Sequence, residues 1–290
     1  MLVEQTLFGV RDKVKIAIDR LQAFEPPEGY YLAFSGGKDS QCIYHLAKEA
    51  GVKFDAHYHL TTVDPPELIY FIKEYYPDVI TDKPETTMWN LIKKRGLPTR
   101  QKRFCCQVLK EGGGEGRIVV TGVRWAESTS RKNNRGVTEV IGKNKADKIL
   151  FNDNDEDRKL FENCQKKGKR VINPIVDWNE NDVWEYLNSR SIKHCCLYDE
   201  GWKRLGCIGC PLAGTEQMLR EFERWPKYRD NYRRAITKWL TGYLERCIKR
   251  KADPCFTSAN AWMEWWLYGT VKQKQCNGQM EIEDMGEGEE

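Results

Sequence analysis

A short stretch of small and polar residues has the composition of a phosphate-binding loop: Ser35, Gly36, Gly37, Lys38, Asp39 and Ser40. It separates an apolar run from a segment with helical periodicity. The two glycines lack Cβ and let backbone N–H groups approach an anion, and the amino end of the following helix adds a positive dipole. The serines can donate hydroxyl hydrogen bonds, Lys38 supplies a positive charge, and Asp39 can hold Mg²⁺ or cap the helix. The stretch therefore predicts a phosphate cradle.

The spacing of this loop differs from two common nucleotide-binding motifs. A Walker A loop has four residues between its first glycine and the sequence Gly-Lys-Ser/Thr, and the dinucleotide fingerprint reads Gly-x-Gly-x-x-Gly. Residues 35–40 match neither pattern. The alternative interpretation is a tight glycine turn that only caps a helix.

The cysteines form the second group of residues that could carry chemistry. The chain has 11 of them, and an odd number without a recognisable secretion signal argues against a disulfide framework. Six fall into three clusters, within residues 103–107, 194–201 and 204–211. Cys207 and Cys210 form a C-x-x-C pair whose intervening glycine lets both sulfurs face one point. Four thiolates at one point bind zinc or an iron–sulfur cluster, and dithiol redox chemistry is the alternative.

The segments around these residues alternate between predicted strands and predicted helices. Hydrophobic periodicity predicts strands at 30–34, 54–60, 78–81, 117–123 and 169–178, and helices at 41–51, 65–76, 86–96 and 179–190. Such alternation with short connections predicts an α/β fold with a doubly wound, mostly parallel sheet. Ligands of these sheets bind at the carboxyl ends of the strands, where we expect both the glycine loop and residues 121–131.

Four regions are expected along the chain. Residues 1–27 are predicted to form an amphipathic helix, because apolar residues recur there at three- and four-residue steps. Residues 28–214 are predicted to form the nucleotide-binding domain, including the cysteine-rich segment. Residues 215–270 are a helical extension interrupted at two prolines, and residues 271–290 are an acidic tail expected to be disordered.

The overall composition narrows the class of protein. With 40% hydrophobic and 31% charged residues, the chain has the composition of a soluble globular protein. No apolar run approaches the roughly 20 residues of a membrane helix, and residues 1–15 carry charges within their apolar stretch. We therefore expect a cytoplasmic protein that does not enter membranes. The last ten residues hold six acids and no base, which leaves the rest of the chain at +10. A basic body suits a nucleotide or a nucleic acid.

The glycine loop resembles the PP-loop of the ATP-pyrophosphatase superfamily. Within it, the chain is similar to the phosphoadenylyl-sulfate (PAPS) reductase-like family in four further segments, which read TTVDPPE, TGVRWAESTSR, NPIVDWNENDVWEYL and LYDEGWKRLGCIGCP. These segments are residues 61–67, 121–131, 173–187 and 197–211, and the similarity spans roughly residues 28–215. The resemblance implies the adenine-nucleotide-binding α/β fold called adenine-nucleotide alpha-hydrolase-like.

The resemblance also implies what the loop holds. Residues 35–40 would bind the phosphates of an adenine nucleotide, either ATP or PAPS. Lys38 and Asp39 would be the catalytic residues, and Mg²⁺ would accompany ATP.

Further anion contacts are implied in the segment at 121–131. Arg124 and Arg131 would contact the nucleotide, and Glu127 and Ser128 would position them. Two arginines can fork onto phosphate or sulfate oxygens. A surface stretch of salt bridges is the alternative interpretation.

Part of the resembling family carries a [4Fe–4S] cluster near the nucleotide, bound by cysteines in equivalent segments. The implied ligands in this chain are Cys105, Cys195, Cys207 and Cys210. Cys106 or Cys196 could replace its neighbour, because adjacent cysteines cannot be ranked from the sequence. Structural zinc is the alternative occupant.

One feature of the family's reductases is not found in this sequence. Sulfonucleotide reductases use a nucleophilic cysteine in a C-terminal Glu-Cys-Gly-x-His pattern, and the nearest cysteines, Cys255 and Cys276, lack its glutamate and histidine. We therefore favour relatives that cleave ATP to AMP and pyrophosphate in order to activate a substrate for sulfur insertion. DNA phosphorothioation and tRNA thiolation are examples of this chemistry.

Three functions stay open. The first is an ATP-dependent adenylating enzyme of sulfur transfer, whose partners would be a nucleic-acid substrate and a sulfur donor. The second is a PAPS or adenylyl-sulfate reductase, which makes sulfite with electrons from a thiol reductant protein. The third is a non-enzymatic module that senses nucleotides or redox state.

Overall fold

The computed structural model describes residues 1–269, apart from residues 8, 143–147, 153 and 163–167. The described chain divides into two compact units, each assembled from segments that are distant in sequence. Unit 1 comprises residues 1–59, 65–82 and 112–205, and unit 2 comprises residues 60–64, 83–111 and 206 onward. The predicted acidic tail, 271–290, lies outside the described residues.

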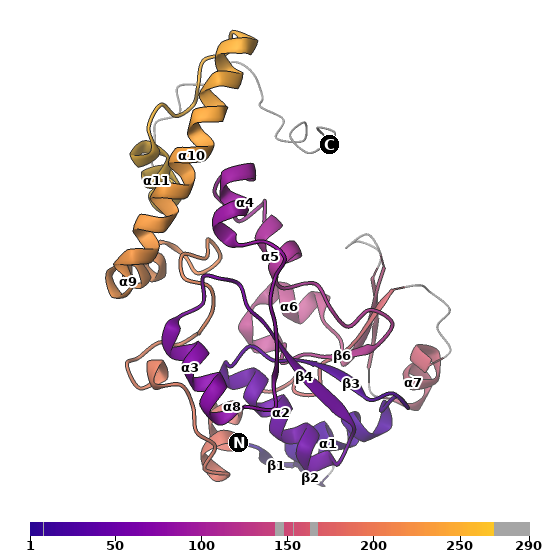
Figure 1. Cartoon of the computed structure of the whole chain (residues 1–290). Helices are drawn as coiled ribbons and strands as arrows, with labels where there is room; N and C mark the ends of the chain where they lie inside the picture. Colours follow the sequence, from indigo (N-terminus) through magenta and orange to yellow (C-terminus); the bar gives the residue numbers. More distant parts are fainter. Residues whose placement is uncertain (8, 143–147, 153, 163–167, 270–290) are drawn as a thin grey trace. The chain divides into compact units, whose positions relative to one another are not determined.

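Unit 1 is built on a seven-stranded sheet with the order β5-β4-β3-β6-β9-β7-β8 (Figure 1). Its strands are β3 (Tyr30–Ala33), β4 (Phe54–His59), β5 (Ile80–Asp82), β6 (Ile118–Val120), β7 (Thr138–Ile141), β8 (Lys148–Phe151) and β9 (Lys169–Ile172). The first four and β9 run parallel, whereas β7 and β8 pair antiparallel. The predicted α/β fold with a mostly parallel sheet is confirmed.

Strands β7 and β8 were not predicted from the sequence. They lie where the alternation of strands and helices weakens, and four residues each give little periodic signal. Strand β7 pairs with β9, and β8 pairs with β7: Thr138 of β7 lies opposite Ile172 on one side and Phe151 on the other. Tertiary pairing therefore extends the sheet beyond the last predicted strand.

Helix α2 (Lys38–Ala50) packs against the central strand β3 of this sheet. Unit 1 also contains α1 (Lys13–Ala23), α3 (Pro66–Tyr75), α6 (Thr129–Asn134), α7 (Asp155–Glu162) and α8 (Glu180–Ser189), with 3₁₀ turns η1 (Trp125–Glu127) and η2 (Cys196–Tyr198). Helix α2 packs against both α1 and α8. Tyr30 and Leu32 of the central strand are fully buried, and the Tyr30 hydroxyl donates to the carbonyl of Leu21 at 2.7 Å. The core thus holds β3 firmly beneath α1.

The predicted helix over residues 1–27 is wrong in its first half. Strands β1 (Val3–Thr6) and β2 (Gly9–Asp12) form an antiparallel hairpin, and the helix begins only at Lys13. Gly9 has φ of +120°, a conformation that favours glycine, and Asp12 caps the helix by accepting from backbone amides. The turn and the cap outweigh an apolar spacing that also fits a helix.

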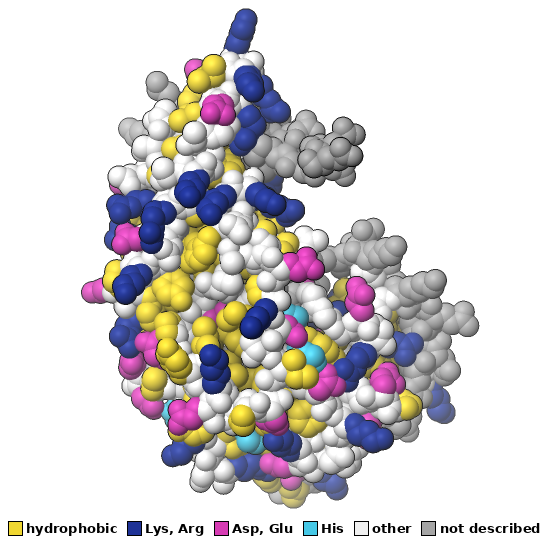
Figure 2. All heavy atoms as spheres, viewed as in Figure 1, with side chains coloured by type: hydrophobic (Ala, Val, Ile, Leu, Met, Phe, Trp, Pro, Cys, Tyr) yellow, Lys and Arg dark blue, Asp and Glu magenta, His cyan; other side chains and the backbone are white. Residues whose placement is uncertain are grey.

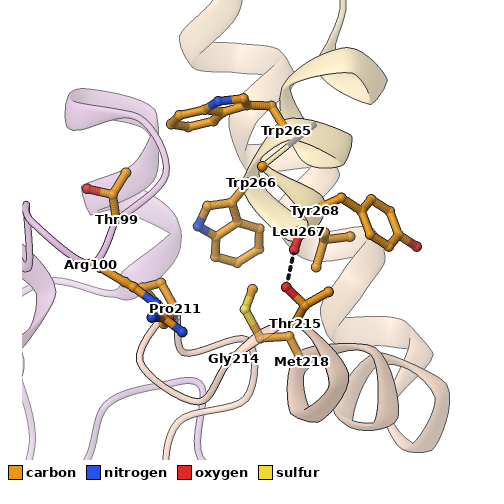
Figure 3. Close-up of a pocket in the computed structure, with 11 residues that line it drawn as sticks. Thr99, Arg100, Pro211, Gly214, Thr215, Met218, Trp265, Trp266, Leu267 and Tyr268 are labelled. Atoms are coloured by element: carbon orange, nitrogen blue, oxygen red, sulfur yellow. Dashed lines mark hydrogen bonds between the residues drawn. The ribbon is translucent and has the colours of Figure 1, made fainter. Parts of the chain in front are cut away.

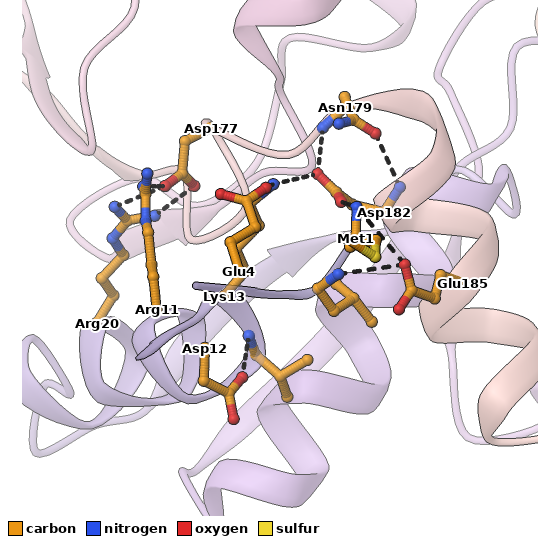
Figure 4. A network of polar contacts seen from close by, with 12 residues as sticks. Met1, Glu4, Arg11, Asp12, Lys13, Arg20, Asp177, Asn179, Asp182 and Glu185 are labelled. Atoms are coloured by element: carbon orange, nitrogen blue, oxygen red, sulfur yellow. Dashed lines mark hydrogen bonds and ion pairs between the residues drawn. The ribbon is translucent and has the colours of Figure 1, made fainter. Parts of the chain in front are cut away.

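A buried ion pair ties this N-terminal segment to α8 (Figure 4). Lys13 Nζ lies 2.9 Å from Asp182 Oδ2, and their side chains are 6% and 0% exposed. The same oxygen accepts from the backbone N–H of Asn179 at 2.9 Å. Burial acts to raise the pKa of Asp182, but the hydrogen bonds from Lys13 and Asn179 prevail and hold it below its usual value.

Unit 2 is helical in its described part. It contains α4 (Met88–Arg95), α5 (Phe104–Leu109), α9 (Thr215–Arg224), α10 (Pro226–Arg250) and α11 (Ala259–Tyr268). Helices α4, α9 and α11 all pack against the long α10. Trp239 and Trp262 form an aromatic core there, with ring centroids 4.8 Å apart. The predicted helical C-terminal part is confirmed. None of the described helices is both long and apolar enough to cross a bilayer.

Candidate functional site

The glycine loop lies at the position where this sheet topology predicts a ligand. Strand β3 has β4 on one side and β6 on the other, because the chain completes one half of the sheet before it crosses to the other half. Residues 34–37 follow β3 and residues 121–124 follow β6. Both segments therefore leave the carboxyl edge of the sheet at its switch point, where doubly wound folds bind ligands.

The loop itself requires glycine. Gly36 has φ of +72°, and a Cβ there would lie 2.7 Å from Ile72 Cδ1 and 2.8 Å from Leu68 Cδ1. Helix α2 begins at Lys38, and its cap residue Gly37 offers no side chain to accept the first-turn amides. Ser35 Oγ donates to Ser40 Oγ at 3.2 Å. The amides and hydroxyls at this helix end suit an anion.

Lys38 is buried beside the loop. Its side chain is 5% exposed, and Nζ lies 3.3 Å from Glu180 Oε1. Nζ also donates to the backbone carbonyl of Lys203 at 2.9 Å, and the Lys38 backbone N–H donates to the Tyr198 hydroxyl at 2.9 Å. The ammonium is therefore held in place before a phosphate arrives.

Arg124 joins the loop to α8. Its Nε lies 2.7 Å from Asp39 Oδ1, its Nη2 lies 2.9 Å from Glu180 Oε2, and its side chain is only 3% exposed. The Arg124 backbone N–H donates to Glu127 Oε2 at 3.1 Å. One guanidinium thus brings two carboxylates together beside the phosphate loop.

Arg131 lies in a group of arginines. Its guanidinium pairs with Glu127, and the Ser128 hydroxyl accepts from the Arg131 backbone N–H at 3.2 Å, which caps α6. Burial lowers the pKa of Arg131 to about 10, and the positive charges of Arg204 and Arg135 act in the same direction. Concentrated positive charge of this kind favours a bound anion. The predicted set Arg124, Glu127, Ser128 and Arg131 is therefore one connected group.

Sequence reasoning did not single out several residues of this site. Glu180 and Tyr198 contact Lys38, and both lie within segments that carry the family resemblance, which was the available signal. The Lys203 carbonyl gives no signal, because any residue could supply it. Arg135 and Arg204 could not be ranked among the many basic residues without knowing how the chain folds.

In unit 2, the turn between the cysteines of the C-x-x-C pair is held by surrounding side chains. Gly209 has φ of +73°, and a Cβ there would lie 2.9 Å from Phe222 and 3.0 Å from Tyr232. The Gly209 N–H donates to Glu221 Oε2 at 2.6 Å, and the Tyr232 hydroxyl donates to the Ile208 carbonyl at 2.8 Å. These contacts fix the backbone between Cys207 and Cys210.

Three of the predicted ligands interact within unit 2. A hydrogen bond with Cys106 raises the pKa of the Cys105 thiol, as do burial and the nearby Cys207 and Cys210. The hydrogen bond from Cys105 in turn lowers the pKa of Cys106 to about 6. Cys207 raises the pKa of the Lys110 ammonium. These thiols therefore lie near one another with the Lys110 ammonium beside Cys207, and thiolates are donors that suit zinc or an iron–sulfur cluster.

Cys195 belongs to unit 1 and is described apart from the other three. It is buried, which raises the pKa of its thiol to about 12, and it interacts with Cys196. Within the described residues, no three His, Cys, Asp or Glu side chains are arranged as a ready metal site. The four-cysteine ligand set therefore stays a prediction.

Of the two cysteines considered as a reductase nucleophile, Cys255 and Cys276, the structure describes one. Cys255 is partly buried in unit 2, where its backbone N–H donates to the Tyr243 hydroxyl at 2.9 Å. Cys276 lies outside the described residues.

Comparison with known proteins adds the family. A model described as the phosphoadenosine phosphosulfate reductase domain matches residues 29–213. The uncharacterized protein MJ0973 of Methanocaldococcus jannaschii is 28% identical over 205 residues, covering 67% of this chain and 44% of that protein. The adenosine 5′-phosphosulfate reductase of Oceanobacillus iheyensis is 27% identical over 195 residues, covering 63% of this chain and 70% of the reductase. The chain thus spans less than half the length of the first relative.

A solved structure is also similar. The U34-tRNA thiolase NcsA from Methanococcus maripaludis with its [4Fe–4S] cluster aligns over 84% of each chain, at 13% identity and a TM-score of 0.42. That likeness carries no functional argument. The family match covers more than half of this chain and confirms the predicted resemblance. The chain belongs to the phosphoadenosine phosphosulfate reductase domain family, within the PP-loop superfamily.

Proposed function

We propose that the chain binds Mg²⁺ and ATP at residues 35–40 and adenylates a substrate for sulfur transfer. The convergence of Asp39 and Glu180 on Arg124, beside Lys38, carries this proposal. Arg124 and Lys38 neutralise these two carboxylates and hold both of them beside the loop, where their oxygens can also bind Mg²⁺. Mg²⁺ binds carboxylates together with substrate phosphates, so this arrangement supports ATP over a sulfonucleotide.

The residues of the loop then have distinct roles. An oxygen of the substrate attacks the α-phosphorus, and the bond from that phosphorus to the bridging oxygen breaks, so that pyrophosphate departs with the electron pair. Lys38 and the amides of α2 neutralise the departing pyrophosphate. Arg124 and Arg131 hold non-bridging oxygens. A sulfur nucleophile then displaces AMP from the adenylated substrate.

A [4Fe–4S] cluster belongs to the same proposal. Cys105, Cys207 and Cys210 would supply three ligands, and Cys195 the fourth, with Cys106 or Cys196 as replacements. When bound, the cluster would carry or deliver sulfur. Zinc is the alternative metal, and iron and acid-labile sulfide assays on anaerobically purified protein distinguish the two. We expect Cys207→Ser to lower the iron content and Cys42→Ser, at a buried cysteine outside the clusters, to leave it unchanged.

A sulfonucleotide reductase is the second candidate. It is favoured by the family itself and by the adenosine 5′-phosphosulfate reductase among the relatives. In that case the nucleotide would be PAPS or adenylyl sulfate, the product sulfite, and the partner a thiol reductant protein. Cys255 is then the described candidate nucleophile, and turnover that survives Cys255→Ser counts against it.

The first experiment compares the two nucleotide classes. Anaerobically purified chain is incubated with Mg²⁺ and ATP, or with PAPS or adenylyl sulfate and a dithiol, and the products are separated by chromatography. AMP and pyrophosphate from ATP support the proposal. Sulfite without ATP cleavage replaces it with the reductase.

An enzyme that cleaves ATP only when its acceptor substrate is present would give no product in this experiment. Nucleotide binding is therefore measured as well. Calorimetric titration with ATP, with and without Mg²⁺, reports binding without turnover. We expect Mg²⁺ to tighten ATP binding, and Asp39→Asn to remove most of that effect. ATP binding that is indifferent to Mg²⁺ contradicts the roles given to Asp39 and Glu180.

A further inference from the structure

Two neighbouring hollows in unit 2 combine basic and aromatic side chains. The first (Figure 3), of about 270 Å³, is lined by Arg100 from the loop after α4 and by Trp265 and Trp266 of α11. The second, of about 530 Å³, is lined by Arg229 and Arg233 of α10, and also by the carboxylates of Asp230 and Glu264. Leu267 and Tyr268 line both hollows, so the end of α11 separates them.

The arginines of these hollows are only partly engaged by the protein. Arg100 Nε donates to the Pro211 carbonyl at 3.0 Å, which orients the guanidinium without neutralising it. Arg233 lies 3.1 Å from Asp230, and both side chains are exposed. Among the described residues, no acidic side chain lies within ion-pair distance of Arg100 or Arg229. Their charge is therefore available to an anionic ligand.

Positive charge continues along the surface of unit 2. Its described residues include 19 Lys and Arg against 10 Asp and Glu, and Figure 2 shows basic side chains along the length of α10. Lys227, Arg234 and Lys238 are exposed and spaced seven and four residues apart, which places them on one face of the helix, away from the face that carries Arg229 and Arg233. All of these residues add to the positive potential that a polyanion meets as it approaches unit 2.

Aromatic rings distinguish the kind of polyanion. Tyr268 is 48% exposed at the boundary of the two hollows. Trp265 is partly exposed and rests on Phe256, with ring centroids 5.5 Å apart. Arginines without an acidic partner in the described part of the chain, here Arg100 and Arg229, beside exposed aromatic rings are the combination that binds single strands, because phosphates meet the cations while bases stack on the rings. An acidic peptide would use the cations alone.

We propose that the surface formed by Arg100, Arg229, Arg233 and Tyr268 binds single-stranded nucleic acid, and that the basic residues on the other face of α10 add to the positive field that attracts the strand. If the bound strand is also the substrate of sulfur transfer, the inference deepens the proposed function, and that part rests on it. The binding itself needs no ATP. A strand with unstacked bases fits better than a duplex, whose bases are stacked away from the rings.

The test measures affinity of the full chain, without ATP, for fluorescent DNA and RNA single strands of about 12 nucleotides. We expect Tyr268→Ala to weaken binding roughly tenfold and Tyr268→Phe to retain it, because phenylalanine still stacks. We expect Arg100→Gln with Arg229→Gln to weaken binding and to flatten the dependence on salt by about 0.7 per lost contact. The matched control is Lys53→Gln with Lys73→Gln, two exposed lysines of unit 1.

Three results would overturn the proposal. The first is that the double arginine variant binds the strand as tightly as wild type and as the double lysine control. Another is equal binding of Tyr268→Ala and Tyr268→Phe. The third is displacement of the strand by polyglutamate at the same charge concentration, which would indicate an acidic protein partner. A difference in affinity between the DNA and RNA probes shows which kind of single strand the surface prefers. Lys38→Met should bind as wild type does, so failure of ATP chemistry and failure of this surface give different patterns.

Discussion

Positive charge is arranged in opposite ways at the glycine loop of unit 1 and at the basic surface of unit 2. Lys38 and Arg124 are buried and held by carboxylates, whereas Arg229 and Lys238 are exposed, with no acidic partner among the described residues. Burying and pairing a cation costs desolvation energy but fixes its position. An exposed cation costs little and acts over a distance that salt shortens. The first arrangement can orient a reaction, and the second can only collect a polyanion.

The largest effect that tests this comparison concerns Lys38. We expect Lys38→Met to reduce nucleotide turnover at least about 100-fold, because the leaving phosphate loses its charge partner. Steady-state product release measured by chromatography gives the rate. Lys48→Met is the control, since this lysine lies on the same helix and is half exposed. A Lys38→Met variant within about threefold of wild type would remove Lys38 from the reaction.

A smaller loss is expected at Arg124. Arg124→Gln frees the Asp39 and Glu180 carboxylates, and we expect ATP affinity to fall roughly 10- to 100-fold because a buried charge pair is broken. Arg124→Lys should recover only part of the affinity, since an ammonium cannot bridge both carboxylates as a guanidinium fork does. Calorimetric titration measures both variants. Full recovery by lysine would mean that charge alone matters at this position.

The stability of unit 1 should depend on a paired charge in the same way. We expect Asp182→Asn to cost up to about 3 kcal/mol of unfolding free energy near neutral pH, because buried Lys13 loses one of its two carboxylate partners and keeps only Glu4. The pKa of Asp182 is lowered by folding, so its stabilisation is present above the unfolded value of about 3.9 and is lost as pH falls through the folded value. The stabilities of wild type and Asp182→Asn should therefore approach each other as the pH falls below about 4.

Denaturant titrations between about pH 3 and pH 7 check this prediction. Asp19→Asn removes an exposed carboxylate from α1 and serves as the control, with an expected change near zero. A stability difference that stays constant with pH would show that packing, and not the ion pair, is responsible.

The smallest effect on stability is expected at the exposed lysines of unit 2. Lys94→Gln and Lys238→Gln remove exposed charges of α4 and α10 that have no acidic partner within the described residues. We expect each to change the unfolding free energy by less than about 0.5 kcal/mol, with a gain as plausible as a loss. Thermal denaturation at low and high salt measures this. A loss above about 2 kcal/mol would mean that these lysines hold the fold, and the contrast between the two regions would fail.

Local sequence was sufficient to predict the turn between strand and helix at the glycine loop. Gly36 and Gly37 between a buried strand and a helix are read from neighbouring residues, because backbone conformation and helix capping depend on short-range sterics. The same reasoning failed near the amino terminus, where Gly9 turns the chain and Asp12 starts the helix. There the apolar spacing was compatible with a helix, and only hairpin pairing excluded it.

Taken alone, the sequence determined the family, the alternating α/β pattern and the residue types of the loop. Tertiary structure decided which charges meet. Arg124 reaches Glu180 across 56 residues and Lys38 reaches the Lys203 carbonyl across 165. Such partners depend on the order of strands and the packing of α8 against α2, which local preferences do not encode. For the same reason, only the folded chain distinguishes the neutralised arginines of the nucleotide loop from the available arginines of unit 2.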